Sequence, residues 1–347
     1  MGSSPSGGTN LSKTMTIKSH SRGMFLGLVV GDVLGAPVQF GVSSAAIREH
    51  LDSLREYHDN CELPKGVYTD DTSMALCLAD SLIEKKGYNS YDIMQKYCDW
   101  EDHGYRSYFD YGFDVGTQVI QSSIEYSKNK IVPKTKERTI SAGNGCIMRL
   151  APAIIAAAEH STLEQTVELA WISGRETHYS EVAEMGVEVF ANLLYRALHA
   201  GSAKKSKIID LENLYFTSDE LKETWLDNNW LISGRVHSDG ECLCDLGGYV
   251  MDALTIAIWA FLATDNFEDG MLKVLCLGGD TDTNCAIYGQ LAGAFYGVEA
   301  IPQNWQNGLA ISKEAIFDLV DQLLALDSCP ILATRFEEDS EYYKPSS

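Results

Sequence analysis

Two short acidic segments lie far apart along this chain, and a fold that uses both of them must bring them together. The first is Thr69-Asp70-Asp71-Thr72, and the second is Gly279-Asp280-Thr281-Asp282-Thr283. Carboxylates held close together repel one another, and one Mg²⁺ or Ca²⁺ offsets two of these charges. Two such ions would balance all four aspartates. The pair of segments therefore predicts a joint site for two divalent cations.

Each segment taken alone has a simpler explanation. Thr69 or Asp70 can cap a helix that continues through Met74. Neighbouring side chains on a helix diverge by about 100°, so Asp70 and Asp71 can reach two ions only from a helix start, where the helix dipole also favours negative charge. The second segment is no EF-hand, because it lacks the glycine and the distal glutamate of that motif. The same design occurring twice favours the binuclear site.

Most of the remaining chain has helical periodicity. Apolar residues recur every three or four positions over residues 71–83, 162–171, 181–198, 250–263 and 312–326, and no run alternates as a strand would. A hydrophobic fraction of 45% over 347 residues is enough for one large core. We predict an all-α protein. Gly289, Gly293 and Gly297 fall four apart, which favours a close approach of another helix.

The chain divides into one domain with two tails. Residues 1–20 are rich in Gly, Ser, Thr and Lys and lack the apolar region of a signal peptide, so we predict a disordered tail there. The domain spans residues 21–333, and residues 334–347 form a C-terminal tail. Residues 201–245 are polar and interrupt the helical pattern. They are interpreted as an insertion with a short helix near residues 219–226, and as a lid or partner surface.

The composition bounds the partners and the compartment. Forty-nine acidic and 27 basic residues give a net charge of −22, which disfavours nucleic-acid and membrane surfaces, tolerates cationic partners and aids solubility. Nine scattered cysteines without a CxxC pair are typical of a reducing compartment. No stretch reaches the ~18 apolar residues of a membrane span. We predict a cytoplasmic protein without nucleic-acid or membrane partners.

Several further motifs are ambiguous when taken singly. The glycine pattern around Asp32 is weak evidence for a dinucleotide turn, and Asp32 can instead cap or pair a neighbouring group. The Gly143-Asn144-Gly145 turn exposes N–H groups that could seat a phosphate, or it is an ordinary loop before a helix. Asp114 can be a helix cap, and His178 can be a structural hydrogen-bond donor.

Together and in sequence order, these motifs resemble the ADP-ribosylglycohydrolase family, whose founding type removes ADP-ribose from an arginine of dinitrogenase reductase. The resemblance runs from Gly23 to about Trp305, outside the insertion. The matching segments are Gly31-Asp32-x-x-Gly35-x-Pro37, Tyr68-Thr69-Asp70-Asp71-Thr72-x-Met74, Phe113-Asp114-Val115-Gly116, Gly143-Asn144-Gly145-x-x-Met148-Arg149, Thr177-His178, Gly248-Tyr249-Val250-x-Asp252-x-Leu254 and Gly279-Asp280-Thr281-Asp282-Thr283-x-x-Ala286.

The resemblance implies a single-domain orthogonal helical bundle around two Mg²⁺ or Mn²⁺ ions. It assigns the metal ligands to Thr69, Asp70, Asp71, Asp280, Asp282 and Thr283. The predicted catalytic carboxylates are Asp70, Asp71 and Asp114. The predicted substrate-binding residues are Asp32, Gly116, Asn144, Gly145, His178 and Tyr249. Within this set the resemblance places the diphosphate along Asn144 and Gly145, the nucleotide side at His178, and the adenine on Tyr249.

The activity implied is metal-dependent hydrolysis of the glycosidic bond between ADP-ribose and a modified protein side chain, most simply arginine. Relatives that act on serine linkages carry a glutamate two residues after the proline, where this chain has Gln39. Alternatives are serine-linked hydrolysis and a non-catalytic ADP-ribose-binding or structural member of the same family. An isoprenoid synthase is disfavoured, because Thr72 and Ser73 are followed by Met74 and not by the further aspartate of that motif.

Overall fold

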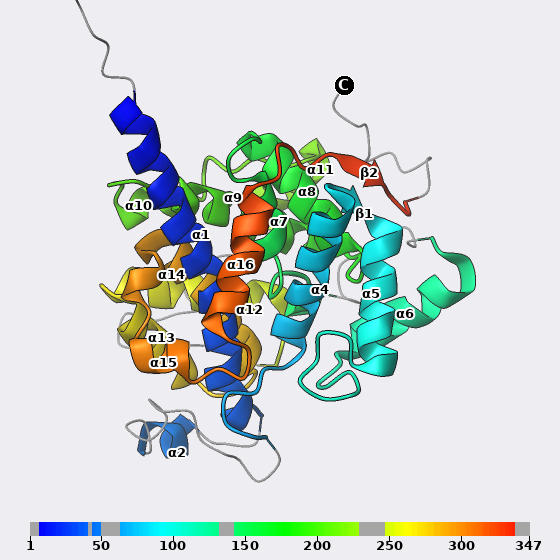
Figure 1. Cartoon of the computed structure of the whole chain (residues 1–347), viewed down its shortest axis with the longest axis horizontal. Coiled ribbons are helices and arrows are strands. Elements are labelled where there is room, and N and C mark those ends of the chain that lie inside the picture. Colours follow the sequence, from blue (N-terminus) through cyan, green and yellow to red (C-terminus); the bar gives the residue numbers. More distant parts are fainter. Residues whose placement is uncertain (1–6, 41–43, 50–62, 132–141, 229–246, 337–347) are drawn as a thin grey trace, which may run out of the picture.

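A computed structural model describes residues 7–40, 44–49, 63–131, 142–228 and 247–336 (Figure 1). The described part of the chain is mostly helical, which confirms the all-α prediction. The first half contains α1 (Gly7–Gly35), α2 (Ser44–Glu49), α4 (Asp70–Lys85), α5 (Ser90–His103), α6 (Thr117–Asn129), α7 (Ala151–Ala157) and α8 (Leu163–Arg175). The second half contains α9 (Glu181–Leu198), α10 (Lys205–Ile208), α11 (Asp219–Asn228), α12 (Val250–Ala263), α13 (Phe267–Leu275), α14 (Thr281–Tyr296), α15 (Gln303–Asn307) and α16 (Lys313–Leu324).

Short elements complete the architecture. Single 3₁₀ turns occur at η1 (Ala36–Val38), η2 (Asn144–Cys146) and η3 (Val298–Ala300). Two short strands, β1 (Tyr88–Asn89) and β2 (Ile331–Ala333), pair in parallel and join the end of the described chain to the loop after α4.

Helix α1 runs through the middle of the molecule and packs along much of its length against α14 (Figure 1). Glycines allow the two backbones to approach closely. A side-chain carbon at Gly27 would lie 2.2 Å from the carbonyl oxygen of Gly289, and one at Gly293 would lie 1.9 Å from that of Gly23. The predicted close helix contact is therefore confirmed, with α1 as the partner. This crossing fixes where α14 begins relative to the end of α1.

The N-terminal tail prediction was wrong for the described residues, because α1 begins at Gly7. Ile17 is buried, and Lys18 Nζ lies 2.8 Å from an Asp321 carboxylate oxygen on α16. The Gly- and Ser-rich composition does not predict this helix, which is stabilised by packing against α14 and α16. The segment Ile17–Val38 is also long and apolar enough to cross a membrane (mean hydropathy 1.3), which was not expected; 89% of its most apolar stretch is buried inside the protein.

The start of the predicted insertion is ordered and packs on α9. The expected short helix is found as α11, and Trp225 on it is buried beside Phe216. Asn192 of α9 donates to the Tyr215 carbonyl oxygen at 2.9 Å. The rest of the predicted insertion, residues 229–245, lies outside the described residues, so its role as a lid or partner surface stays a prediction.

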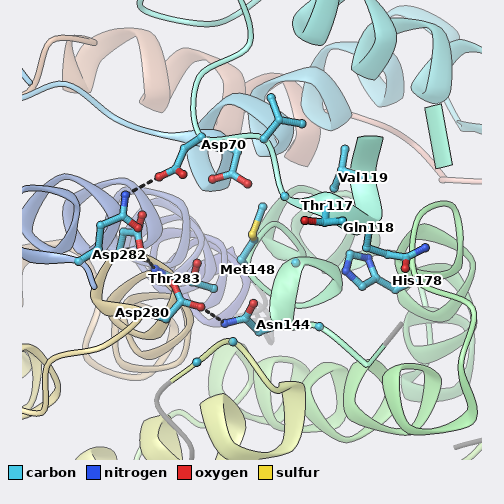
Figure 2. Close-up of a pocket in the computed structure, with 18 of the residues that line it drawn as sticks. Asp70, Thr117, Gln118, Val119, Asn144, Met148, His178, Asp280, Asp282 and Thr283 are labelled. Atoms are coloured by element: carbon cyan, nitrogen blue, oxygen red, sulfur yellow. Dashed lines mark hydrogen bonds between the residues drawn. The ribbon is translucent and has the colours of Figure 1, made fainter. Parts of the chain in front are cut away.

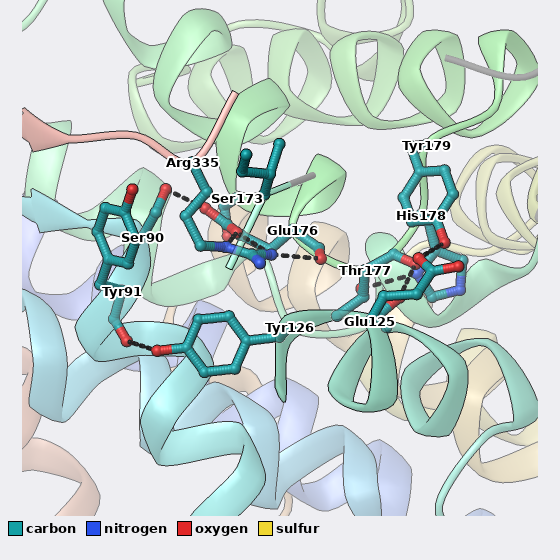
Figure 3. Close-up of polar contacts among 12 residues, drawn as sticks. Ser90, Tyr91, Glu125, Tyr126, Ser173, Glu176, Thr177, His178, Tyr179 and Arg335 are labelled. Carbon is teal, nitrogen blue, oxygen red and sulfur yellow. Dashed lines mark hydrogen bonds and ion pairs between the residues drawn. The ribbon is translucent and has the colours of Figure 1, made fainter. Parts of the chain in front are cut away.

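The C-terminal tail prediction was wrong at its first residues, because Arg335 enters the core after β2 (Figure 3). Its Nε donates to Glu176 Oε2 at 2.9 Å, and its Nη2 donates to the Glu176 carbonyl oxygen at 3.2 Å. Glu176 also accepts from the hydroxyls of Tyr88 and Ser90. The end of the described part of the chain is thereby fixed to the segment that carries His178. Residues 337–347 are outside the described part of the chain.

We expect Gly27→Ala to lower the free energy of unfolding by about 2 kcal/mol. Overpacking against a backbone oxygen costs about 3 kcal/mol, and the higher helix propensity of alanine returns about 1 kcal/mol. The matched control is Gly116→Ala, since no described atom lies within 4 Å of the added carbon and φ is −62°. Urea unfolding of both variants provides the measurement. Equal stability of the two variants would contradict a tight α1–α14 contact.

We expect Arg335→Met to lower the free energy of unfolding by about 3 kcal/mol, because a buried carboxylate would lose its cation. The control is Lys18→Met, which removes an ion pair whose side chains are 43% and 34% exposed, and it should cost no more than about 1 kcal/mol. Thermal and urea unfolding measure both. Similar losses in the two variants would show that Arg335 is not a core residue.

Candidate active site

The two acidic segments meet at the starts of two helices. Thr69 precedes α4, whose first turn contains Asp70 and Asp71, and Asp280 precedes α14, whose first turn contains Asp282. The Thr283 hydroxyl contacts Asp71 Oδ2 at 3.4 Å. Four residues of these segments line one end of a cavity of about 640 Å³: Asp70, Asp280, Asp282 and Thr283 (Figure 2). Asp114 also lines this cavity.

A buried aspartate on α1 holds the first turn of α4. Both backbone N–H groups and both hydroxyls of Thr69 and Thr72 donate to the Asp32 carboxylate, at distances of 2.6–3.1 Å. Burial raises the pKa of Asp32 to about 6, although these hydrogen bonds act to lower it. Asp32 was predicted to bind substrate, but it lies beneath the site and is absent from the described cavity lining. Its observed contacts are those of a support for Thr69 and Asp70.

The clustered carboxylates raise one another's pKa. Burial, followed by the charges of Asp114 and Asp32, raises the pKa of Asp70 well above its usual range. Burial and the charges of Asp32 and Asp70 do the same for Asp71, and burial with the charge of Asp280 raises the pKa of Asp282. Asp71 Oδ1 is buried and has no hydrogen-bond partner among the residues that the structure describes. Such a cluster gains stability from a bound cation.

The donor set fits a hard divalent cation such as Mg²⁺ or Mn²⁺. Its ligands are carboxylate and hydroxyl oxygens, with an orphaned buried oxygen on Asp71. Within the described ranges, no three His, Cys, Asp or Glu side chains form a ligand cluster on their own. Mg²⁺ is usually held by one or two carboxylates and keeps several waters, so a site shared between aspartates and threonines meets its needs. We retain Thr69, Asp70, Asp71, Asp280, Asp282 and Thr283 as predicted ligands.

The loop after η1 connects the second acidic segment with Asp114. The Gln39 side-chain amide donates to Asp114 Oδ2, and the Phe40 N–H donates to the Gly279 carbonyl oxygen at 2.8 Å. Both Phe40 (φ 46°) and Asp114 (φ 61°) have left-handed backbones, which cost energy for residues other than glycine. Two such residues facing one cavity mark a functional region. The Phe40 ring is 66% exposed.

The opposite wall of the cavity is neutral. The Asn144 amide donates to Asp280 Oδ2 at 2.7 Å, which joins η2 to the acidic end (Figure 2). Gly145 and His178 lie beside Asn144, and Gly116 precedes α6 at the cavity rim. Tyr249 is half-buried before α12, in a segment bridged to Gly143, and is not among the described lining residues.

His178 is a neutral side chain in this wall. Burial, and then the positive charge of Arg149, lower the pKa of His178 to about 3. Its Nδ1 lies 2.8 Å from the Thr177 hydroxyl. A neutral imidazole can still donate one hydrogen bond into the cavity.

Sequence reasoning missed part of the lining. Phe40, Met148 and the first turn of α6 with Thr117 and Gln118 also face the cavity. The signal for α6 was a glycine directly before an amphipathic helix, next to the Asp114 motif. Phe40 had no sequence signal, since its exposure and its backbone conformation depend on contacts with Gly279.

Comparison with known proteins agrees with this geometry. The family model for ADP-ribosylglycohydrolase matches residues 13–330. The chain is 29% identical over 320 residues to the ADP-ribosylarginine hydrolase Tri1 of Pseudomonas putida (strain GB-1), covering 89% of this chain and 81% of that protein. It is 26% identical to the ADP-ribosyl-[dinitrogen reductase] glycohydrolase of Rhodospirillum rubrum, covering 90% and 97%.

A solved structure, described as an ADP-ribosylglycohydrolase-related protein complex, superposes with a TM-score of 0.69 at 33% sequence identity. It covers 90% of this chain and 99% of the solved chain. The fold and the site thus define a helical protein with an acidic cavity at the starts of two helices. This chain belongs to the ADP-ribosylglycohydrolase family.

We expect Mg²⁺ and Mn²⁺ to bind with release of protons, because the aspartate pKa values are raised in the absence of a cation. A raised pKa means that these groups stabilise the fold below the unfolded-state pKa of about 3.9, and that this stability is lost as the pH rises through the folded-state values. Without cation, the free energy of unfolding should therefore fall as pH rises, and added cation should restore it.

Calorimetric titration in buffers of different ionisation enthalpy measures the released protons. Asp282→Asn is the binding-deficient variant, and Asp80→Asn, altered outside the cavity at the Arg106 ion pair, is the control. Heats that do not depend on the buffer would contradict the raised pKa values.

Proposed function

We propose that this protein is a hydrolase, dependent on Mg²⁺ or Mn²⁺, that cleaves the glycosidic bond between ADP-ribose and a modified arginine of a protein. The observation that carries this proposal is the division of one cavity into an acidic and a neutral end. Asp70, Asp114, Asp280 and Asp282 line the first, and Asn144, Gly145 and His178 line the second. A ligand with a reactive sugar at one end and a diphosphate nucleotide at the other suits this arrangement.

The acidic end suits the bond that breaks. Cleavage of the bond from the ribose anomeric carbon to the guanidinium nitrogen develops positive charge on the sugar, which fixed carboxylates stabilise. In this proposal Asp114 accepts a proton from the attacking water, with Asp70 or Asp71 as the alternative acceptor. The two ions, when bound, would supply charge that orients the ribose hydroxyls. The bond's electron pair stays on the guanidine nitrogen, and the proton that the carboxylate takes from the water is passed to this nitrogen, so that guanidinium is released.

The neutral end suits the nucleotide. The cavity of about 640 Å³ lies within the range of roughly 300–1,000 Å³ found for small-molecule sites. The Asn144-Gly145 turn and the first turn of α6 offer polar side chains and backbone N–H groups to a diphosphate. Stacking of the adenine on Tyr249 remains part of the proposal.

Gln39 favours arginine over serine as the linked side chain. A glutamate at this position would place a further carboxylate against Asp114, whereas the Gln39 amide donates a hydrogen bond to it. The ADP-ribosylarginine hydrolase Tri1 of Pseudomonas putida is 29% identical to this chain, which supports arginine as the linked side chain. Serine-linked hydrolysis and a non-catalytic ADP-ribose-binding role are the alternatives. The complete set of four aspartates favours catalysis.

The remaining parts of the proposal concern partners and compartment. The substrate is an ADP-ribosylated protein and the product is ADP-ribose, without nucleic-acid or membrane partners. Within the described ranges, the free thiols of Cys77, Cys98, Cys146, Cys285 and Cys329 support a reducing, cytoplasmic compartment.

The test is ADP-ribose release from an arginine-ADP-ribosylated protein, with Mg²⁺ or Mn²⁺ and then with EDTA, beside a serine-linked substrate. We expect cation-dependent release from the arginine substrate. Asp282→Ala should lower kcat/KM by more than the roughly 10–100-fold typical of residues that only support a metal site. Gln39→Glu should preserve cation binding and reduce the rate on arginine.

The outcomes separate the alternatives. Release from the serine substrate alone would move the assignment to that linkage. ADP-ribose binding without release from either substrate would favour the binding protein. Turnover of Asp282→Ala at the wild-type rate would overturn the role of the cation site.

A further inference from the structure

The ring of His178 lies in the cavity wall with one nitrogen turned away from the protein's own acceptors. Side-chain carbons added at Gly143 and Gly145 would lie 3.1 and 3.2 Å from Nε2, so the ring needs the bare glycine backbone beside it. Nε2 has no hydrogen-bond partner among the residues that the structure describes, and the ring lines the cavity. The protonation of Nε2 therefore determines whether this wall donates a hydrogen bond to a ligand or accepts one from it.

The hydrogen bonds on the other side of the ring determine that proton. Arg149 Nη2 donates to the Thr177 hydroxyl oxygen at 2.6 Å, and this oxygen lies 2.8 Å from His178 Nδ1 (Figure 3 shows the Thr177–His178 pair). Arginine can only donate, so the hydroxyl oxygen accepts from it. Among the described residues, the one acceptor in contact with the Thr177 hydroxyl proton is Nδ1. Nδ1 is then an acceptor, and a neutral ring carries its proton on Nε2.

Arg149 is itself held rigidly. It is fully buried, and its guanidinium lies 5.0 Å from the centre of the Tyr97 ring. Its Nη1 donates to the Gly145 carbonyl oxygen at 2.6 Å. One guanidinium therefore fixes both the turn at Asn144-Gly145 and, through Thr177, the ring of His178. The Arg335–Glu176 pair anchors the residue directly before Thr177.

We propose that Arg149 and Thr177 are positioning residues that hold His178 as the Nε2–H tautomer, so that Nε2 donates a hydrogen bond to an oxygen of the ligand's diphosphate. This inference rests on the proposed function for the identity of the ligand. The opposite tautomer would turn a nitrogen lone pair towards the cavity, where it would repel a phosphate oxygen. The sequence motif places Thr177 and His178 side by side, and the structure adds Arg149 as the group that orients them.

The tautomer can be measured directly by long-range ¹⁵N–¹H correlation spectra of the histidine rings. The chain has eight histidines, and His178→Gln identifies the signal. We expect the unliganded wild-type protein to show the Nε2–H tautomer. Thr177→Val keeps the branched shape but removes the hydroxyl, so it should give a mixture of tautomers and weaken ADP-ribose binding about tenfold, the equivalent of one hydrogen bond.

Two variants serve as controls for folding and for the hydroxyl. Thr177→Ser should retain both the tautomer and the affinity. Ser173→Ala lies one turn earlier on α8, and its hydroxyl has no partner within the described ranges, so the tautomer and the affinity should again be unchanged. The wild-type spectrum tests the inference even if Thr177→Val fails to fold.

The outcomes separate this inference from the proposed function. An Nδ1–H tautomer in the wild-type protein, or an unchanged tautomer in Thr177→Val, would overturn the roles of Arg149 and Thr177. A mixed tautomer with unchanged ADP-ribose affinity would overturn the donor role of Nε2. The expected tautomer and affinity change, together with no hydrolysis of either linkage, would support the inference and overturn the catalytic proposal alone.

Discussion

The close crossing of α1 and α14 is the contact on which the rest of the structure depends. Glycines at the crossing let the two backbones touch, so α14 begins beside the end of α1. The same helix α1 carries Asp32, which holds the start of α4. The starts of α4 and α14, which carry the acidic residues, are thereby both positioned by α1. A wider crossing would separate Asp282 from Asp71 and divide the site.

The site works against the stability that the crossing provides. Burial raises the pKa values of Asp70, Asp71 and Asp282 because the ionised carboxylates lose their hydration, and repulsion between neighbouring aspartates raises these values further. A core that tolerates this repulsion must be rigid elsewhere. The buried pairs around Glu176 and the α1–α14 contact supply that rigidity, and a bound cation would convert the repulsion into affinity.

The sequence was most informative where chemistry and spacing coincide. The four aspartates of the two acidic segments, together with Asp114, Asn144, Gly145 and His178, were predicted from local motifs, and all of these except Asp71 line the cavity. Asp32 was recognised as part of a motif, but its contact with Thr69 and Thr72 could not be derived from a glycine pattern. Both tail predictions failed at their inner ends, because Ile17 and Arg335 are ordered by packing against distant residues.

The sequence by itself determined the helical fold class, the two acidic helix starts and the glycine spacing of α14, because these follow from local periodicity and from the chemistry of neighbouring residues. Only the tertiary structure decided which helix meets those glycines, that Asp32 lies beneath the site, and that Arg149 orients His178 through Thr177. Such contacts join residues far apart in the chain, and their geometry depends on the packing of the whole core.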